Sequence, residues 1–299
     1  LLIPFAGTTL GAAMVFFIDQ EGRKWDTEYF TNTVVRVEYI EYWETYVSKT
    51  CYKDCNCKTV KSSNGKSSSR KCDTCPYDCS YCDKNPAQYW AYNERGDRAP
   101  ISSVEYQRIK NKFGNEKFVE LNRSIRHWGS CGEDGDKYVS EWNGNLEQFE
   151  PYCTDHNYVN KVRLSNTYGF RDLTEDEMKR VKKYPQIINV YQPSIVGNWP
   201  WKDDAAKATF KLDRFNGLNG KKLQIKAFIF TYYNQRSDVV DLQKIYFENG
   251  NKNEIIVCVG YDGNGVTWVR AFSWTDEKIC ENEAARFYTK DMKLEALVD

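Results

Sequence analysis

Residues Tyr46 to Cys82 constrain the fold of this chain most strongly, and they read YVSKTCYKDCNCKTVKSSNGKSSSRKCDTCPYDCSYC. Seven of the eleven cysteines lie between Cys51 and Cys82, on two arms that flank a tip rich in serine and lysine. Asn64-Gly65 in that tip is a strong signal for a tight turn between antiparallel strands. The stretch therefore predicts a long β-hairpin that carries cysteines on both arms.

The strand register around this turn brings cysteines of the two arms opposite one another. If the numbers of two facing residues sum to about 129, the facing pairs are Cys57 with Cys72, Cys55 with Cys75, and Cys51 with Cys79. Cys72 is out of phase with Cys75 and Cys79, because side chains alternate between the two faces of a strand. We expect a bulge near Asp73 or Thr74 that corrects the phase.

Two interpretations of these cysteines are open. In the first, cross-strand disulfides hold the hairpin, each contributing about 2 to 4 kcal/mol. In the second, one zinc ion is bound by Cys55, Cys57, Cys72 and Cys75, with fourteen residues between the second and third ligands, as in zinc ribbons. We expect disulfides and no cofactor, because the uncharged residues 1–18 predict a membrane anchor, and an anchored chain is consistent with an oxidising compartment. Cys82 then pairs with Cys131, with Cys153, or with no partner.

The hairpin is also strongly basic. Residues 49–71 contain seven basic residues and one acidic residue, whereas the whole chain has 42 of each kind and no net charge. The overall balance argues against a chain-wide nucleic-acid surface, and we expect no specific nucleic-acid partner. The local charge of +6 predicts contact with an anionic surface or a protein, with a solvated loop as the alternative. The candidate contact residues are Lys53, Lys58, Lys61, Lys66, Arg70 and Lys71.

The first eighteen residues, LLIPFAGTTLGAAMVFFI, carry no charge. As a helix they would span about 27 Å, close to the thickness of a bilayer core. Small residues at Gly7, Gly11 and Ala12 are typical of a helix that packs against other membrane helices. We therefore predict a transmembrane or membrane-anchoring helix over residues 1–18, with the rest of the chain extracytoplasmic. A buried core helix is the alternative.

Residues 3–17, IPFAGTTLGAAMVFF, resemble the first transmembrane helix of ZIP-family metal transporters. The resemblance covers about 15 residues and implies a membrane helix. It does not imply transport, because the sequence has no second apolar run of comparable length.

Patterns in the rest of the chain predict an α+β fold with three regions: the helix at 1–18, a β-rich region at 19–165 that contains the hairpin 46–82, and a layered α+β domain at 166–299. Strands are expected at 31–39, 43–47, 88–92, 138–142, 152–164, 223–232, 255–261 and 266–274. Helices are expected from Ser102 or Ser103 to Phe113, after Thr174, at 205–215, from Ser237 or Asp238 to Phe247, and at 281–297.

Residues 223–272 resemble the membrane-tethered TPM domains of extracytoplasmic proteins, through a strand, a helix and the segment GNKNEIIVCVGYDGNGVTWVRAF. The whole region after the first helix resembles uncharacterised membrane-anchored proteins of Bacteroidota and their phages. The TPM-like segment suggests an extracytoplasmic metal-dependent hydrolase as an alternative, although the acidic residues expected of a metal-assisted phosphatase are not recognisable in it. The second resemblance implies no defined activity.

The sequence has few residues that point to catalysis. Of its two histidines, His127 lies near Cys131, but neighbouring glycines indicate a turn. Glu133, Asp134 and Asp136 offer oxygen ligands that could bind calcium, although an ordinary acidic turn is favoured. No phosphate-binding glycine loop or HExxH motif occurs. We expect a membrane-anchored, non-enzymatic binding or assembly protein with no catalytic residues. The alternatives are a zinc-binding module and an extracytoplasmic metal-dependent hydrolase that uses Asp134 and Asp136.

Overall fold

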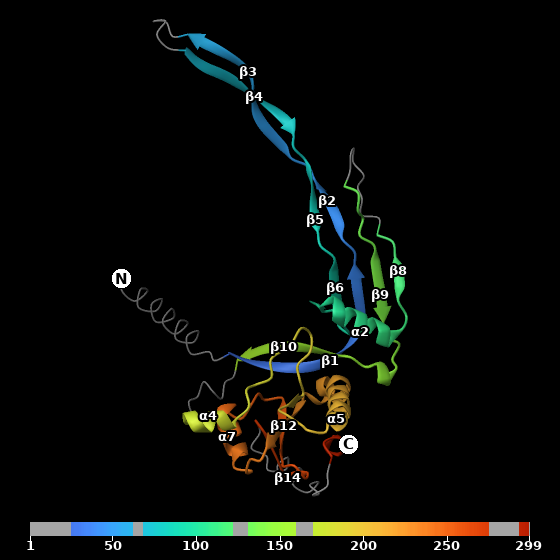
Figure 1. Ribbon diagram of the computed structural model, residues 1–299, viewed down its shortest axis with the longest axis vertical. Coiled ribbons are helices and arrows are strands. Elements are labelled where there is room, and N and C mark those ends of the chain that lie inside the picture. The colour runs from blue at the N-terminus through green and yellow to red at the C-terminus, as the bar shows by residue number, and fades with distance from the viewer. Residues whose placement is uncertain (1–24, 62–67, 122–130, 160–169, 275–292, 299) are drawn as a thin grey trace, which may run out of the picture. The chain divides into compact units, whose positions relative to one another are not determined.

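The fold is α+β, as the sequence predicts, and its described residues contain more strand than helix. The computed structural model describes residues 25–61, 68–121, 131–159, 170–274 and 293–298 (Figure 1). The predicted helix at 1–18 lies outside these residues. Among the described residues, no helix is both long and apolar enough to cross a membrane.

The chain divides into two compact units. One, the sheet unit, contains the residues up to Val35, Tyr92–Ala99 and the chain from Gly144 onward. The other, the hairpin unit, contains Arg36–Ala91 and Pro100–Asn143. The division passes through three strands, because β1 (Trp25–Ile40), β6 (Gln88–Asn93) and β7 (Arg98–Pro100) each have residues in both units.

The base of the hairpin unit is a sheet covered by one helix. Its strands are β6, the second half of β1, β9 (Lys137–Glu141) and β8 (Lys117–Val119), and β7 (Arg98–Pro100) pairs with β6. The helix α2 (Ser103–Phe113) begins where predicted, with Ser102 and Glu105 forming a capping box. Its Tyr106 is buried against the stacked rings of Tyr39 and Tyr89, whose centroids lie 4.9 Å apart.

The predicted cysteine hairpin is confirmed and belongs to this unit. It is a two-stranded ribbon made of β2 (Trp43–Val47) with β5 (Tyr81–Asn85), followed by β3 (Thr50–Lys61) with β4 (Ser68–Asp78). The ribbon is long and twisted, and its tip at 62–67 lies outside the described residues (Figure 1).

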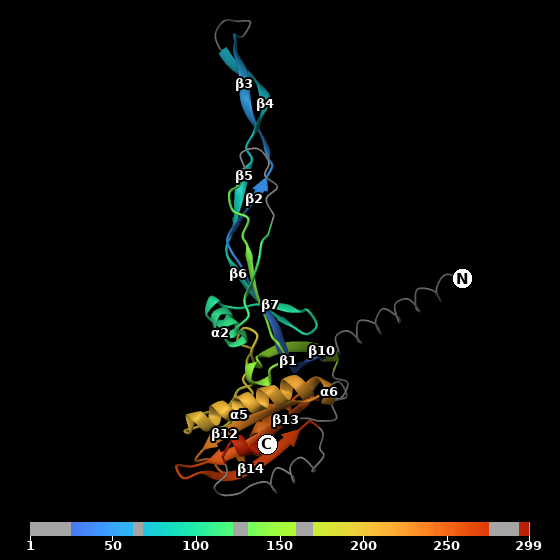
Figure 2. The same cartoon turned by 90° about the vertical axis from the view of Figure 1, so that its right-hand side faces the viewer.

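The sheet unit contains a four-stranded sheet with helices on both faces. Its strands in spatial order are β11 (Ile195–Val196), β12 (Lys226–Tyr233), β13 (Glu254–Tyr261) and β14 (Val266–Ser273). The first three are parallel, and β14 returns antiparallel through the predicted Asp262–Gly265 turn. Figure 1 shows β12 between α5 (Lys202–Phe215) and α7 (Val239–Tyr246), and Figure 2 shows α5 lying along the strands.

Alternating residues of β12 fill the two cores. Phe228, Phe230 and Tyr232 pack with Val239 and Val240 of α7, as expected for side chains that point to one face of a strand. Ile229, on the other face, packs with the buried residues of α5. This alternation explains why the strand reads as one continuous apolar run.

Several element boundaries differ from the predicted ones. β12 begins at Lys226 and not at Leu223, because α6 (Lys221–Leu223) ends in a left-handed Gln224. A π-helical turn at Asn216–Gly220 precedes α6, and Leu146–Gln148 forms a 3₁₀ turn. α4 (Glu175–Arg180) has the expected capping box but is short. Of the predicted helix at 281–297, residues 281–292 lie outside the described part, and Glu295–Leu297 is a 3₁₀ turn.

The first half of β1 pairs with β10 (Pro151–Val159), and polar contacts attach this pair to the four-stranded sheet. The Asn253 side-chain amide donates to the Tyr29 carbonyl at 2.9 Å. The Lys252 ammonium lies 3.0 Å from the Glu28 carboxylate. Because one partner in each contact belongs to β1 and the other precedes β13, the contacts fix the strand pair against the sheet.

Lys226 lies at the centre of this junction and is buried. Its ammonium donates to the Thr31 hydroxyl, and Cys153, Asp213 and Glu254 are close enough to interact with it electrostatically. Burial lowers the pKa of Lys226 and raises the pKa of Asp213 to about 6. Burial also raises the pKa of Cys153 to about 11. The group therefore combines a desolvated cation with carboxyl groups that resist ionisation.

Asp213→Asn is expected to remove part of the pH dependence of stability. The folded pKa of about 6 exceeds the unfolded value of about 3.9, so the folded protein keeps a proton that the unfolded chain has released. This contribution to stability is complete below about pH 4 and is lost as the pH rises through about 6. The measurement is the free energy of unfolding, obtained by denaturant titration at about pH 4 and at a pH above about 6. Between these two pH values it should fall by about 3 kcal/mol more in the wild type than in the variant.

Asp176→Asn is the matched control, because that side chain is 92% exposed and should leave the pH dependence unchanged. Identical pH dependence in Asp213→Asn and the wild type would contradict the raised pKa.

Candidate binding surface on the disulfide hairpin

The pairing of β3 with β4 contains the bulge that the cysteine spacing requires. The bulge lies on β3, whereas it was expected on the strand that is β4. Cys55 faces Asp73 and Lys58 faces Lys71, so Asn56 and Cys57 together oppose Cys72. The predicted position near Asp73 or Thr74 is therefore wrong. Asn56 takes a left-handed φ of 49°, which asparagine tolerates better than most residues, and this explains why the bulge forms there.

Three disulfides cross this ribbon. They join Cys51 to Cys79, Cys55 to Cys75, and Cys57 to Cys72, the pairs given by the sequence register. In β3 and β4 the cysteines are half-buried and every other residue is exposed. The sulfur atoms therefore form the interior of a ribbon that has no apolar core of its own.

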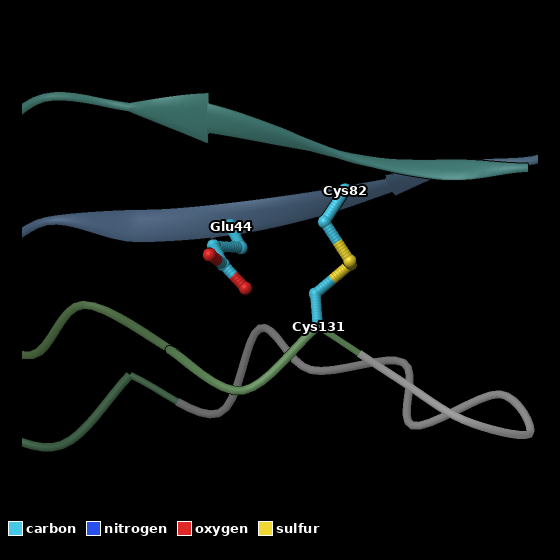
Figure 3. A group of neighbouring side chains, drawn as sticks. All are labelled: Glu44, Cys82 and Cys131. Carbon is cyan, nitrogen blue, oxygen red and sulfur yellow. A yellow bond between two sulfur atoms is a disulfide. The ribbon is translucent and has the colours of Figure 1, made fainter.

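A fourth disulfide joins Cys82 of β5 to Cys131, which settles the three options left open for Cys82. Figure 3 shows the Glu44 side chain beside this bond. The Glu44 carboxylate accepts hydrogen bonds from the Tyr42 hydroxyl at 2.8 Å and the Gly132 amide at 3.1 Å. These bonds lower the pKa of Glu44. The group thus attaches the segment before β9 to the ribbon.

Glu44, Cys82 and Cys131 are also the one set of side chains, among the described residues, that come close enough together to share a metal ion. Their ligand atoms lie within 4.8 Å of one another. A metal would need the thiolate forms of both cysteines, which the disulfide removes. In the oxidised protein this set is a cross-link and not a ligand set.

The predicted basic residues are exposed wherever the structure describes them. Lys53, Lys58 and Lys61 lie on β3, and Arg70 and Lys71 lie on β4. Lys66 lies outside the described residues.

Lys58 lies directly opposite Lys71 across the strand pair. Like charges in facing positions destabilise a strand pair, so this arrangement is unfavourable for folding alone.

Exposed tyrosines, which the sequence pattern does not single out, accompany these charges. Tyr52 is 68% exposed and Tyr77 is 41% exposed. The Lys53 ammonium lies 5.2 Å from the centroid of the Tyr77 ring, within cation–π range. The ribbon therefore presents cations and aromatic rings together, a combination suited to interfaces where one side is polar and the other partly apolar.

The structure does not bring the remaining candidates from the sequence together in the described part of the chain. His127 lies outside the described residues, and His156 lies 3.2 Å from the Glu28 carboxylate. Asp136 accepts a hydrogen bond from the Leu121 amide, and Glu133, Asp134 and Asp136 do not converge as a ligand set. The free thiols of Cys153 and Cys258 are both buried.

Comparison with protein-family models, with curated proteins and with solved structures gave no match.

Replacing Cys57 and Cys72 together by serine is expected to loosen the tip of the ribbon. The lost cross-link closes a loop of about 15 residues, so its removal should destabilise the distal hairpin by about 3 kcal/mol. Trypsin should then cleave at Lys58, Lys61 and Arg70 faster than in the wild type. The melting of the sheet unit should not change, because the cross-link lies in the other unit.

Cys153→Ala is the control, since this buried thiol forms no disulfide. Peptide mapping without reductant should recover the four cross-linked pairs. Recovery of free, zinc-loaded thiols at Cys55, Cys57, Cys72 and Cys75 would support the zinc interpretation instead.

Proposed function

We propose that this chain is a membrane-anchored, non-enzymatic binding or assembly protein that contacts an anionic surface through the β3–β4 hairpin. The observation that carries the proposal is a basic ribbon whose charged side chains are exposed and whose strands are cross-linked by three disulfides. A rigid strand pair holds its cations in fixed positions, which lowers the entropic cost of binding.

The distribution of positive charge on the ribbon favours binding to an extended surface over binding to a small ligand. The described basic residues are spread along both strands of the ribbon. Each basic residue near an anionic lipid surface contributes about 1 kcal/mol, so several weak contacts can act together. The unfavourable pairing of Lys58 with Lys71 also favours an external partner, because an anionic surface would relieve the repulsion.

Two separate observations support the proposed location. Disulfides persist in oxidising compartments, which favours an extracytoplasmic body. The uncharged segment 1–18 and its resemblance to a transporter helix support an anchor at that end. Deleting residues 1–18 is expected to release the protein from membranes during alkaline extraction, with the full chain as the control. Retention of the shortened chain would contradict the anchor.

The variant Lys58→Glu tests the proposed binding separately from the stability of the hairpin. The substitution places opposite charges at facing positions, which should stabilise the hairpin by about 0.2 to 1 kcal/mol. It should weaken binding at least about fivefold, because one cationic contact of about 1 kcal/mol is lost. The measurement is interferometry of the full chain in neutral detergent on surfaces coated with phosphatidylglycerol or phosphatidylcholine.

Lys222→Glu is the matched control, since it changes the net charge equally at an exposed lysine of the other unit. Wild-type binding should require the anionic lipid and weaken with added salt. Equal losses in both variants would indicate a general charge effect, and no binding by the wild type would refute the proposed surface.

A further inference from the structure

The sheet unit contains a second candidate site, at the carboxyl ends of its parallel strands. β11 ends at Val196, β12 at Tyr233 and β13 at Tyr261, and the three strands run in the same direction. Ligand sites of open parallel sheets lie beyond this edge, where the loops diverge. Residues 197–201 and 262–265 are the loops that follow β11 and β13.

Two adjoining cavities lie at this edge, with volumes of about 450 and 420 Å³. Both are lined by Trp199 and Trp201, so they share these rings as a common wall. We call the pair of cavities the aromatic groove. The first is completed by Lys202, Asp203, Asp204, Asn264, Gly265 and Lys293, and the second by Asn198, Pro200, Tyr233, Tyr261, Asp262 and Gly263.

Four aromatic rings run continuously through the groove. Successive centroids lie 5.1 Å apart from Trp201 to Trp199, 4.9 Å from Trp199 to Tyr261, and 5.4 Å from Tyr261 to Tyr233. The inner two rings are buried, whereas Trp201 is 41% exposed and Tyr233 is 58% exposed. The buried pair thus supports two outer rings that remain accessible to a ligand.

Hydrogen bonds hold the walls in place before any ligand binds. The Thr231 hydroxyl donates to the Asn198 carbonyl at 2.8 Å, and the Trp199 indole donates to the Asp204 carboxylate at 2.8 Å. Asp262 accepts from the amides of Asn264 and Gly265 at 2.7 and 3.1 Å. Such a largely pre-formed concave surface is typical of binding sites.

The first cavity also offers uncommitted polar groups. Lys202, Asp203, Asn264 and Lys293 are exposed, and their side chains have no hydrogen bond or ion pair with another described residue. They provide both donors and acceptors beside the Trp201 ring. With two lysines and three aspartates, the groove has no cationic surplus to attract a phosphate.

We propose that the aromatic groove binds an oligosaccharide. A sugar ring has an apolar C–H face that packs on an aromatic ring and a rim of hydroxyl groups that need mixed donors and acceptors. The groove presents these two features side by side. Two cavities on either side of the tryptophan wall accommodate at least two sugar units. The site is independent of the hairpin surface, since all its residues belong to the sheet unit.

The test is binding of the full chain to an array of neutral, N-acetylated and acidic oligosaccharides at high salt, followed by calorimetry with the oligosaccharide that is retained best. Trp201→Ala and Tyr233→Ala should each weaken binding about tenfold, the loss expected for a stacked aromatic contact. Because both side chains are exposed, the variants should melt at the wild-type temperature.

Tyr52→Ala is the matched control, as it removes an exposed tyrosine from the hairpin. Lys58→Glu should also leave the affinity unchanged, which separates this site from an electrostatic one. The proposal is overturned if the wild type retains no oligosaccharide on the array. It is equally overturned if both groove variants bind as tightly as the wild type.

Discussion

A two-stranded ribbon in water buries too little apolar surface to hold itself together, and this constraint governs the hairpin unit. Outside the cysteines, every residue of β3 and β4 is exposed, so hydrophobic burial contributes little to their pairing. Disulfides fill this role because they act by restricting the unfolded chain and need no surrounding core. Their use frees the other side chains of the ribbon from packing. Cations and tyrosines can therefore occupy those positions.

The sheet unit is stabilised by the burial of apolar side chains, in contrast to the disulfide-linked ribbon. Two apolar layers on either side of β12 and β13 provide the burial that the ribbon lacks. At the amino ends of the same strands, the Lys226 group places charges in the interior. Buried charges rarely add net stability, but a buried cation with few acceptable partners specifies one arrangement. Lys226 thus favours the docking of β1 over alternatives that would leave its ammonium unpaired.

The sequence predicted local features well and distant ones poorly. The cysteine pairs followed from counting outward from Asn64-Gly65, because register in a hairpin is set by its turn. The bulge was assigned to the wrong arm, since spacing reveals a phase error without showing which strand carries the extra residue. Pairing of β1 with β10 joins residues more than a hundred positions apart, and neither strand has a pattern that identifies the other. The Lys226 group and the aromatic groove depend on such distant pairings. Trp199 and Tyr261 become neighbours only when β11 and β13 flank β12.

The two candidate surfaces require different scaffolds because they would recognise partners by different forces. An extended anionic surface is bound by many weak, salt-sensitive contacts. Such contacts require exposed cations at fixed spacing along an extended structure and do not require a deep cavity. An oligosaccharide is bound by stacking and directed hydrogen bonds, which need a concave site with fixed walls. The cross-linked ribbon suits the first task, since charges on it are exposed along both strands. The loop edge of a layered sheet suits the second, since Thr231 and Asp204 can hold aromatic residues in place there. Under the two proposals together, the chain would hold two partners at once, which is the property required of an assembly protein.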